Sequence, residues 1–376
     1  MRILVLNAGS SSLKASVLEP PGEDPLLRAG ADWGSDATRA ADRTGDVAAL
    51  LARLSDGGVP LRSIEAVGHR VVHGGTRFTA PVWIDREVLA GIEALRELAP
   101  LHNRIAAETI RAALAALPGV PHVAVFDTAF HAGLAPAAHV YPLPWAWYAE
   151  WGIRRFGFHG LAVAWAVERA AELLGRPASG LGLVVAHLGS GCSVTATWGA
   201  RSLDTSMGLT PLEGLMMGTR AGSIDPGILL AVLRDGRLDL DGLTDALDHR
   251  SGLLGVSGRT ADTRELLPAA AAGDERAVLA LDMFARRAAA GIAAVATSLP
   301  RFDGLVFSGG IGEHAGTVRA AIVARLGPLG IAPVPAREVE ADAVLSRPGA
   351  AVAVMRIEAR EDVVVARQVE TLLARP

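Results

Sequence analysis

The sequence has 376 residues, of which 50% are hydrophobic and 20% are charged. That balance excludes an intrinsically disordered chain, and the length predicts two globular domains. The formal net charge is −4 and no stretch concentrates Lys and Arg, so we expect neither nucleic acid nor a membrane surface as a partner. Cys192 is the single cysteine, and every long apolar run is interrupted by charge or glycine. We therefore expect a cytoplasmic protein.

The basic residues are almost all arginine. Of the 36 Lys and Arg residues, only Lys14 is a lysine. Its Leu-Lys-Ala setting does not match a Walker A loop, a protein-kinase strand or a pyridoxal site. Any phosphate group must therefore be bound by backbone amides and arginines.

Two segments far apart in the chain repeat one pattern, in which a buried strand, a turn of small residues and a second strand follow one another. The first predicted hairpin spans 2–18 with its turn at 7–12, and the second spans 183–197 with its turn at 187–193. We interpret the repeat as two related domains. Most Gly/Ser turns are only turns, but the N–H groups and hydroxyls of these two are also suited to phosphoryl oxygens.

Between and after the hairpins, hydrophobic spacing predicts alternating helices and strands, as in an α/β fold. Helices are expected at 86–98, 103–117, 161–174, 226–234, 240–247, 275–299 and 362–373, and strands at 122–126 and 304–307. The aromatic, Pro-rich stretch 141–147 is predicted to be irregular, and a domain boundary is placed near residue 150.

Arg70 lies inside an apolar strand pattern that ends in Gly74-Gly75. An arginine in that position needs an anionic partner, either a structural carboxylate or a bound substrate. His69 and His73 are four residues apart, a metal-binding spacing on a helix. A segment ending in Gly-Gly is not a helix, and no acidic residue lies nearby, so the metal interpretation is the less favoured one.

Two other segments suggest a site. The loop 204–220 carries three glycines and ends at Arg220, so it is either an elaborate connection or an active-site wall with a phosphate-binding arginine. His159 lies between Phe158 and Gly160, directly before a predicted helix where N–H groups are unpaired. It is either a structural histidine or a participant in chemistry.

The segment 310–315 matches the dinucleotide fingerprint Gly-x-Gly-x-x-Ala. Only about 60 residues follow it, which is too few to complete a Rossmann domain and a substrate domain. The turn therefore favours a mononucleotide. No Gly-x-Ser-x-Gly elbow occurs in the chain, so an α/β-hydrolase is not supported.

Seven ordered motifs together resemble the acetate kinase family, within the superfamily of acetate and sugar kinases, actin and Hsp70-type ATPases. They lie at 6–14, 68–75, 126–131, 153–160, 204–220, 255–258 and 307–313 and cover nearly the whole chain. The resemblance implies two duplicated ribonuclease-H-like domains with a cleft between them, usually in a homodimer. The domains would be 1–150, completed by a C-terminal helix at 363–376, and 151–362. The implied reaction is transfer of the ATP γ-phosphoryl group to acetate, giving acetyl phosphate and ADP.

The resemblance also implies roles for single residues. The catalytic set would be Arg70, Asp127, His159 and Arg220. The two arginines would grip the carboxylate and the travelling phosphoryl group, His159 would donate to its equatorial oxygens, and Asp127 would position groups. Asn7 and Glu361 would hold Mg²⁺ or Mn²⁺, with Asp362 left open as an alternative to Glu361.

Two further sets follow from the resemblance. Apolar residues matching the pocket for the acetate methyl group, beside Arg70, are Val72, Leu101, Phe158 and Pro211. A pocket distinguishes one methylene by only about 1–3 kcal/mol, so propionate is an expected second substrate. The nucleotide would be bound by Ser10, Ser12, Lys14, His187, Gly189, Ser190, Gly191, Asp262, Thr263, Arg264, Gly309, Gly310, Ile311, Gly312 and His314.

Three residues depart from the family's usual pattern on the nucleotide side. They are Ser190, Thr263 and His314, and they leave the phosphoryl donor open. Two other functions also remain open. One is a propionate or butyrate kinase of the same family, and the other is a non-catalytic regulator that binds a nucleotide and responds by domain closure.

Overall fold

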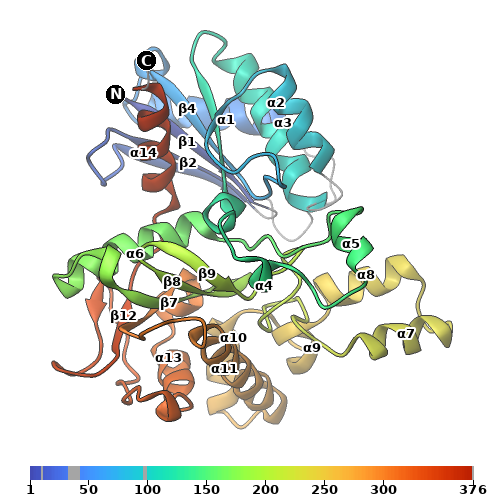
Figure 1. Cartoon of the computed structure of the whole chain (residues 1–376). Coiled ribbons are helices and arrows are strands. Elements are labelled where there is room, and N and C mark those ends of the chain that lie inside the picture. The colour runs from blue at the N-terminus through green and yellow to red at the C-terminus, as the bar shows by residue number, and fades with distance from the viewer. Residues whose placement is uncertain (10–11, 33–42, 96–99, 375–376) are drawn as a thin grey trace. The chain divides into compact units, whose positions relative to one another are not determined.

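The computed structural model describes residues 1–9, 12–32, 43–95 and 100–374, and it has a mixed α/β fold with two six-stranded sheets (Figure 1). The chain forms two compact units. Unit 1 contains Met1–Ala132, Phe158–Trp165 and Arg360–Pro376, and unit 2 contains Gly133–Gly157 and Ala166–Ala359. The functional domains expected at 1–150 and 151–362 stay a prediction beside this division. No helix within the described ranges is long and apolar enough to cross a membrane.

The sheet of unit 1 mixes parallel and antiparallel neighbours. Its strands are β1 (Ile3–Ala8), β2 (Ser12–Leu18), β3 (Leu27–Asp32), β4 (Ala66–Val71), β5 (Val82–Trp83) and β6 (His122–Phe126). Their order is β3-β2-β1-β4-β6-β5, in which β1, β4 and β6 are parallel and the others pair antiparallel. The carboxyl ends of β1, β4 and β6 therefore lie along one edge of the sheet.

The sheet of unit 2 repeats this topology. Its strands are β7 (Gly182–Leu188), β8 (Cys192–Trp198), β9 (Arg201–Thr205), β10 (Gly304–Ser308), β11 (Ala343–Val344) and β12 (Ala353–Arg356). Their order, β9-β8-β7-β10-β12-β11, has the same parallel and antiparallel pairings in the same places. Hairpins β1/β2 and β7/β8 hold equivalent positions, so the duplicated fold predicted from their repeated pattern is confirmed.

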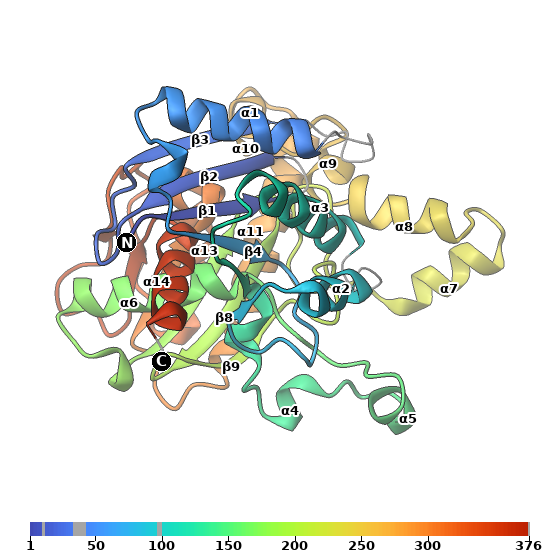
Figure 2. The ribbon, with the colours of Figure 1, turned by 90° about the horizontal axis from the view of Figure 1, so that it is seen from above.

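Helices cover both faces of the unit 1 sheet, which is why β1 and β4 are buried along almost their whole length. On one face, α1 (Arg43–Asp56) and α3 (Pro100–Ala116) share a core with alternate residues of β1 and β2. On the other face, α14 (Glu361–Leu373) packs against β1 and β4 (Figures 1 and 2). A Cβ atom on Gly68 would lie 2.6 Å from Val365 and 2.9 Å from Val369, so α14 needs a glycine in the strand beneath it.

The remaining helices are α2 (Arg86–Ala94), α4 (Pro136–His139), α5 (Trp145–Ala149), α6 (Gly160–Leu174), α7 (Pro226–Arg234), α8 (Leu240–His249), α9 (Gly252–Ser257), α10 (Thr263–Ala271), α11 (Glu275–Ala296), α12 (Gly309–His314) and α13 (Gly316–Val323). The prediction that 141–147 is irregular is wrong from Trp145 onward, because helix α5 begins there. There Trp147 stacks on Trp151 and Trp145 contacts Tyr148, which are contacts between residues four and three apart that favour a helical turn.

The contact between β4 and α14 predicts a stability effect. Gly68→Val should lower the free energy of unfolding by roughly 1–3 kcal/mol or more, because the added side chain overpacks against α14. Gly119→Ala is the matched control, since nothing lies within 4 Å of an added Cβ there. Urea denaturation followed by circular dichroism measures both. Equal stability of Gly68→Val and the wild-type protein would contradict the described packing.

Candidate functional site

A buried polar cluster lies in unit 1 where the parallel strands end. Arg70, near the end of β4, donates from Nε and Nη2 to the two carboxylate oxygens of Asp127, at 3.1 and 2.6 Å. Its Nη1 donates to the side-chain oxygen of Asn7 on β1, at 3.0 Å. Asp127 directly follows β6, so the three side chains come from the ends of three adjacent strands, where α/β sheets bind ligands. Of the two partners expected for Arg70, the structure shows the structural carboxylate.

Glu361, the first residue of α14, completes this cluster. Its Oε2 accepts a hydrogen bond from Asn7 Nδ2 at 3.0 Å and lies 3.4 Å from Arg70 Nε. Asp362 instead pairs with Arg360 at 3.0 Å. Between the two acidic residues left open by the sequence, Glu361 is therefore the one that faces Asn7. One guanidinium in the cluster faces two carboxylates.

The burial of this cluster changes its titration. Burial raises the pKa of Asp127 to about 6, and the nearby Glu361 carboxylate adds to the rise. The charge and hydrogen bonds of Arg70 and the backbone N–H of His159 act in the opposite direction. For Arg70, burial favours the neutral form, but the carboxylates of Asp127 and Glu361 outweigh it and raise its pKa. Arg70 therefore remains a cation at every physiological pH.

His159 is held next to Asp127 by its backbone. Its φ of 58° is left-handed, a conformation that costs energy for a non-glycine residue and is found often at functional sites. Its N–H donates to Asp127 and its carbonyl accepts from Val163 at the start of α6. A Cβ on Gly160 would overlap the Asp127 carbonyl oxygen, so glycine allows the helix to begin this close.

Two of the residues expected to line the apolar pocket lie buried in unit 1. Val72 is 6% exposed and Phe158 is 1% exposed. Phe158 contacts the ring of His73 edge-on, and its carbonyl accepts from His131 Nε2 at 3.0 Å. Pro211 belongs to unit 2. The side chain of Leu101 lies outside the described residues, as does Ser10 among the residues expected to bind the nucleotide.

The histidines that invited a metal interpretation have protein partners. His69 Nε2 lies 2.9 Å from His122 Nδ1 within the buried sheet, and burial lowers the pKa of both. His73 Nδ1 accepts from the N–H of Gly75 at 2.9 Å. Within the part of the chain that the structure describes, no group of three or more His, Cys, Asp or Glu side chains could hold a metal ion.

In unit 2, two segments expected to bind the nucleotide lie side by side: the turn 189–191 and residues 309–312, which form the first turn of helix α12. A Cβ on Gly309 would lie 2.7 Å from the carbonyl oxygen of Leu188, and its φ of 76° also requires glycine. A Cβ on Gly189 would be 3.8 Å from the N of Gly310. The N–H of Gly218 donates to the Ser190 carbonyl at 3.3 Å. The segments 189–191 and 309–312 therefore form one backbone surface.

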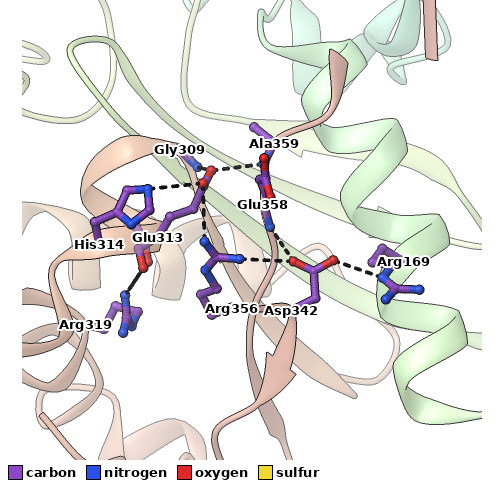
Figure 3. A network of polar contacts seen from close by, with 10 residues as sticks. Arg169, Gly309, Glu313, His314, Arg319, Asp342, Arg356, Glu358 and Ala359 are labelled. Atoms are coloured by element: carbon purple, nitrogen blue, oxygen red, sulfur yellow. Dashed lines mark hydrogen bonds and ion pairs between the residues drawn. The ribbon is translucent and has the colours of Figure 1, made fainter. Parts of the chain in front are cut away.

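Glu313 holds the second of these segments in place (Figure 3). Its Oε1 accepts hydrogen bonds from the N–H groups of Gly309, at 2.8 Å, and Ala359, at 3.0 Å. Its Oε2 lies 3.7 Å from the guanidinium of Arg356, and both side chains are almost fully buried. Glu313 thus links the residues that follow two adjacent parallel strands, β10 and β12.

Arg356 and Asp342 extend this network. Arg356 Nη1 donates to Asp342 at 3.2 Å, and Asp342 also accepts from the N–H of Glu358 and from Arg169 (Figure 3). Neither Glu313 nor Arg356 is among the site residues expected from the sequence. Arg356 nevertheless carries the signal that singles out Arg70, an arginine at the end of an apolar strand.

Arg220 lies in the loop between β9 and α7. Its Nη1 donates to the Pro211 carbonyl at 3.2 Å, and among the described residues no carboxylate lies within ion-pair distance of it. Burial lowers the pKa of Arg220, against the attraction of Asp248 and Cys192. A largely desolvated guanidinium without a carboxylate partner is suited to an incoming anion.

The other residues expected to bind the nucleotide are spread over both units. Asp262 accepts from the N–H of Arg264 and caps α10, while the Arg264 guanidinium folds back onto the same carboxylate at 2.6 Å. Thr263 is buried in the first turn of α10. Lys14 pairs with Asn7 across the hairpin of β1 and β2, and Ser12 is the first residue of β2. His187 is in β7, and Ile311 and His314 are in α12.

Comparisons with known proteins show the family to which these motifs belong. A model of the Acetokinase family matches residues 2–367. The chain belongs to that family. It is 45% identical over 405 residues to an acetate kinase of Deinococcus radiodurans, covering 99% of this chain and 98% of that protein. The crystal structure of a Porphyromonas gingivalis acetate kinase has a TM-score of 0.89 at 34% identity, with 99% of both chains covered. A propionate kinase of Francisella tularensis has a TM-score of 0.87 at 35% identity, with 98% of both chains covered.

The family membership inferred from seven motifs is therefore confirmed along the whole chain. The solved family structures share the two-sheet fold described above.

The raised pKa of Asp127 predicts a pH effect on stability. The folded state binds a proton at Asp127 more tightly than the unfolded chain, whose ordinary value is 3.8. Asp127 therefore favours folding at low pH, and that contribution is lost as the pH rises through about 6. The window is the pH range from 3.8, the ordinary pKa, to about 6, the pKa in the folded protein. As the pH rises through it, the free energy of unfolding of the wild-type protein should fall, relative to that of Asp127→Asn, which cannot titrate, by at most about 1.4 kcal/mol per pH unit. Urea denaturation at several pH values measures it, and a pH-independent difference would contradict it.

The Glu313 network predicts a second stability effect. Glu313→Leu leaves Arg356 without one of its carboxylates and two buried N–H groups without an acceptor, so it should cost about 3–5 kcal/mol. His314→Leu is the control, because His314 contacts the same carboxylate from a side chain that is 69% exposed. Its loss should stay below about 1 kcal/mol. Equal losses in the two variants, measured by thermal unfolding, would refute this account of the network.

Proposed function

We propose that the protein is a kinase that transfers the γ-phosphoryl group of ATP to acetate, giving acetyl phosphate and ADP. The observation that carries the proposal is the buried cluster of Asn7, Arg70, Asp127 and Glu361. It occurs in a chain to which two full-length acetate kinases are 45% and 46% identical. The enzyme is thus a phosphotransferase with a carboxyl group as acceptor, and transfer is direct between the two bound substrates.

Arg70, Arg220 and His159 supply the positive charge and donors that this transfer needs. Its transition state spreads negative charge over three equatorial oxygens, which fixed cations stabilise best, and one such arginine is worth roughly 10³–10⁵ in rate. Asp127 holds the Arg70 fork with two hydrogen bonds, so Arg70 presents its charge without first having to reorganise. Arg220 has no carboxylate to give up within the described residues, and its cation is available to the phosphoryl group.

Asn7 and Glu361 are the residues that would hold Mg²⁺ or Mn²⁺. Mg²⁺ takes oxygen ligands and is usually bound by one or two carboxylates together with substrate phosphates. The cluster fits this preference, because its two carboxylates exceed the single charge of Arg70. The ion would neutralise part of the charge of the β- and γ-phosphates.

The segments 189–191 and 309–312 are the proposed phosphate side of the nucleotide site. The N–H groups of Gly189 and Gly309 donate within the protein, so the other N–H groups of these two segments would bind phosphate, which needs no lysine. The Ser308 hydroxyl, directly before the second segment, is buried and has no hydrogen-bond partner within the described residues. Asp262, Arg264 and Ile311 would lie on the adenine side. A cytoplasmic location and a homodimer are further proposals that rest on family membership alone.

Propionate is the second candidate acceptor. The similar Francisella tularensis structure is that of a propionate kinase. Val72 and Phe158 would offer the alkyl group an apolar surface in unit 1, and such a pocket separates substrates differing by one methylene by only about 10–200-fold. The non-catalytic regulator is the weaker alternative, since it gives no reason to bury the paired Arg70 at the strand ends.

Removing either arginine should abolish most turnover. Arg70→Ala and Arg220→Ala should each reduce kcat/KM for acetate by about 10³-fold or more, measured by trapping acetyl phosphate as the hydroxamate. Arg237→Ala is the control, because that side chain is 74% exposed and pairs only with Asp235 in the described contacts. If kcat/KM for acetate in both arginine variants stayed within a few-fold of the wild-type value, the site would be assigned wrongly.

The same assay decides the substrates. The wild-type enzyme should turn over acetate fastest, propionate more slowly and butyrate least, with ATP preferred to GTP and pyrophosphate as donor. A preference for propionate or for another donor would leave the fold and the roles of the arginines as proposed, but it would change the assigned acceptor or donor. Absence of turnover with every acid and donor would overturn the enzyme proposal in favour of the regulator.

A further inference from the structure

One guanidinium group makes several contacts with the loop that carries Arg220. Residues 206–225 contain no helix or strand, so side-chain contacts and scattered backbone hydrogen bonds fix their course. Arg155 Nη1 donates to the carbonyl oxygens of Thr205 and Ser206, both at 3.0 Å, and of Met207, at 3.1 Å. Three consecutive carbonyls thus point at a single nitrogen. The loop begins by folding around the end of the Arg155 side chain.

The other side of the same guanidinium fixes the middle of the loop. Arg155 Nη2 donates to Glu213 Oε1 at 2.9 Å, and the Tyr141 ring lies under the guanidinium with 5.4 Å from Cζ to its centre. The Tyr141 hydroxyl donates to the other oxygen of Glu213 and accepts from the N–H of Leu209 at 3.0 Å. A Cβ on Gly208 would overlap both the Glu213 carboxylate and the Tyr141 hydroxyl, so the loop passes through a space with no room for a side chain.

Residues 205–214, which contact Arg155 and Tyr141, in turn position Arg220. The carbonyl of Pro211, two residues before Glu213, accepts from Arg220 Nη1 at 3.2 Å. Gly214, directly after Glu213, exchanges hydrogen bonds with Ser223: its N–H donates to the Ser223 hydroxyl at 3.1 Å and its carbonyl accepts from the Ser223 N–H at 2.9 Å. These contacts tie the two halves of the loop together on either side of Arg220.

We propose that Arg155 is a positioning residue that sets the place of Arg220 by folding the loop 205–214 around its guanidinium group. Its planar fork and five donors meet three carbonyls and a carboxylate at once, which the compact ammonium of a lysine does not. The kinetic side of this inference rests on the proposed function, because Arg220 is assigned there to the phosphoryl group. The structural side does not depend on any substrate.

The test replaces Arg155 by lysine, which keeps the charge but loses the fork. A small displacement of a reacting group can cost about 10²-fold, so Arg155→Lys should lower kcat about 10²-fold and raise the acetate KM several-fold, with the ATP KM changed less than about twofold. Arg176→Lys is the matched control. Arg176 also donates to a carboxylate, Asp303 at 3.0 Å, and to a carbonyl, Gly180 at 3.5 Å. These partners lie just before β10 and β7, at the amino-terminal ends of strands in the unit 2 sheet. Arg176→Lys should leave all three constants unchanged.

Hydrogen exchange of the full-length proteins provides a readout that needs no activity. In Arg155→Lys the backbone amides of 205–214 should exchange at least about tenfold faster, while those of β7 and β8 keep their protection; Arg176→Lys should show neither change. If Arg155→Lys fails to fold, Tyr141→Phe takes its place, since it removes only one hydroxyl from these contacts and should give a smaller effect of the same kind.

The outcomes separate the two proposals. Absent turnover in the wild-type enzyme, with faster loop exchange in Arg155→Lys, would overturn the proposed function and retain the positioning role of Arg155. Unchanged loop exchange in Arg155→Lys, or kinetic constants within twofold of an active wild-type enzyme, would overturn the positioning role. An equal rise of both KM values would also overturn it, because that result indicates general loosening of the fold.

Discussion

The bidentate pairing of Arg70 with Asp127 is the interaction on which the proposed acceptor site in unit 1 depends. Both groups lie inside the sheet's edge, with side-chain exposures of 14% and 1%, where an unpaired charge would be strongly unfavourable. Pairing keeps Arg70 charged and fixes its orientation, and it places Asn7 and Glu361 against the same guanidinium. The strained backbone of His159 is held by a hydrogen bond to the same carboxylate.

Unit 2 also pairs a buried arginine with a buried carboxylate, but the two residues lie at the ends of the opposite strands. In unit 1 the arginine is on the inner strand β4 and its carboxylate follows β6. In the equivalent strands of unit 2, the arginine ends β12, the strand between β10 and the edge strand β11, and its carboxylate follows β10. Arg356 and Glu313 thus hold a turn in place, whereas Arg70 and Asp127 leave a charge at a strand end. The duplicated sheet sets where the polar groups lie, and the exchange of partners gives the two edges different chemistry.

Arginine carries most of this organisation, which suits a chain with a single lysine. Arg70 makes three directed hydrogen bonds in its cluster, and Arg155 makes four with its loop. A guanidinium has five donors in one plane, so it orders several chain segments at once. Arg220 differs from both, since its one described oxygen acceptor is the carbonyl of Pro211. The two paired arginines build the site, and Arg220 keeps donors for an anionic ligand.

The sequence by itself determined the α/β class, the two repeated hairpins and the need of Arg70 for an anionic partner, because strand periodicity and small-residue turns are encoded by neighbouring residues. Its ordered motifs also determined the family. Only the tertiary structure decided which carboxylate meets Arg70 and that Glu361, 354 positions from Asn7, joins the cluster. It alone decided that the loop 205–214 folds around Arg155. These pairings depend on strand register and on where a helix or loop returns to the sheet, and such long-range geometry leaves no local pattern in the chain.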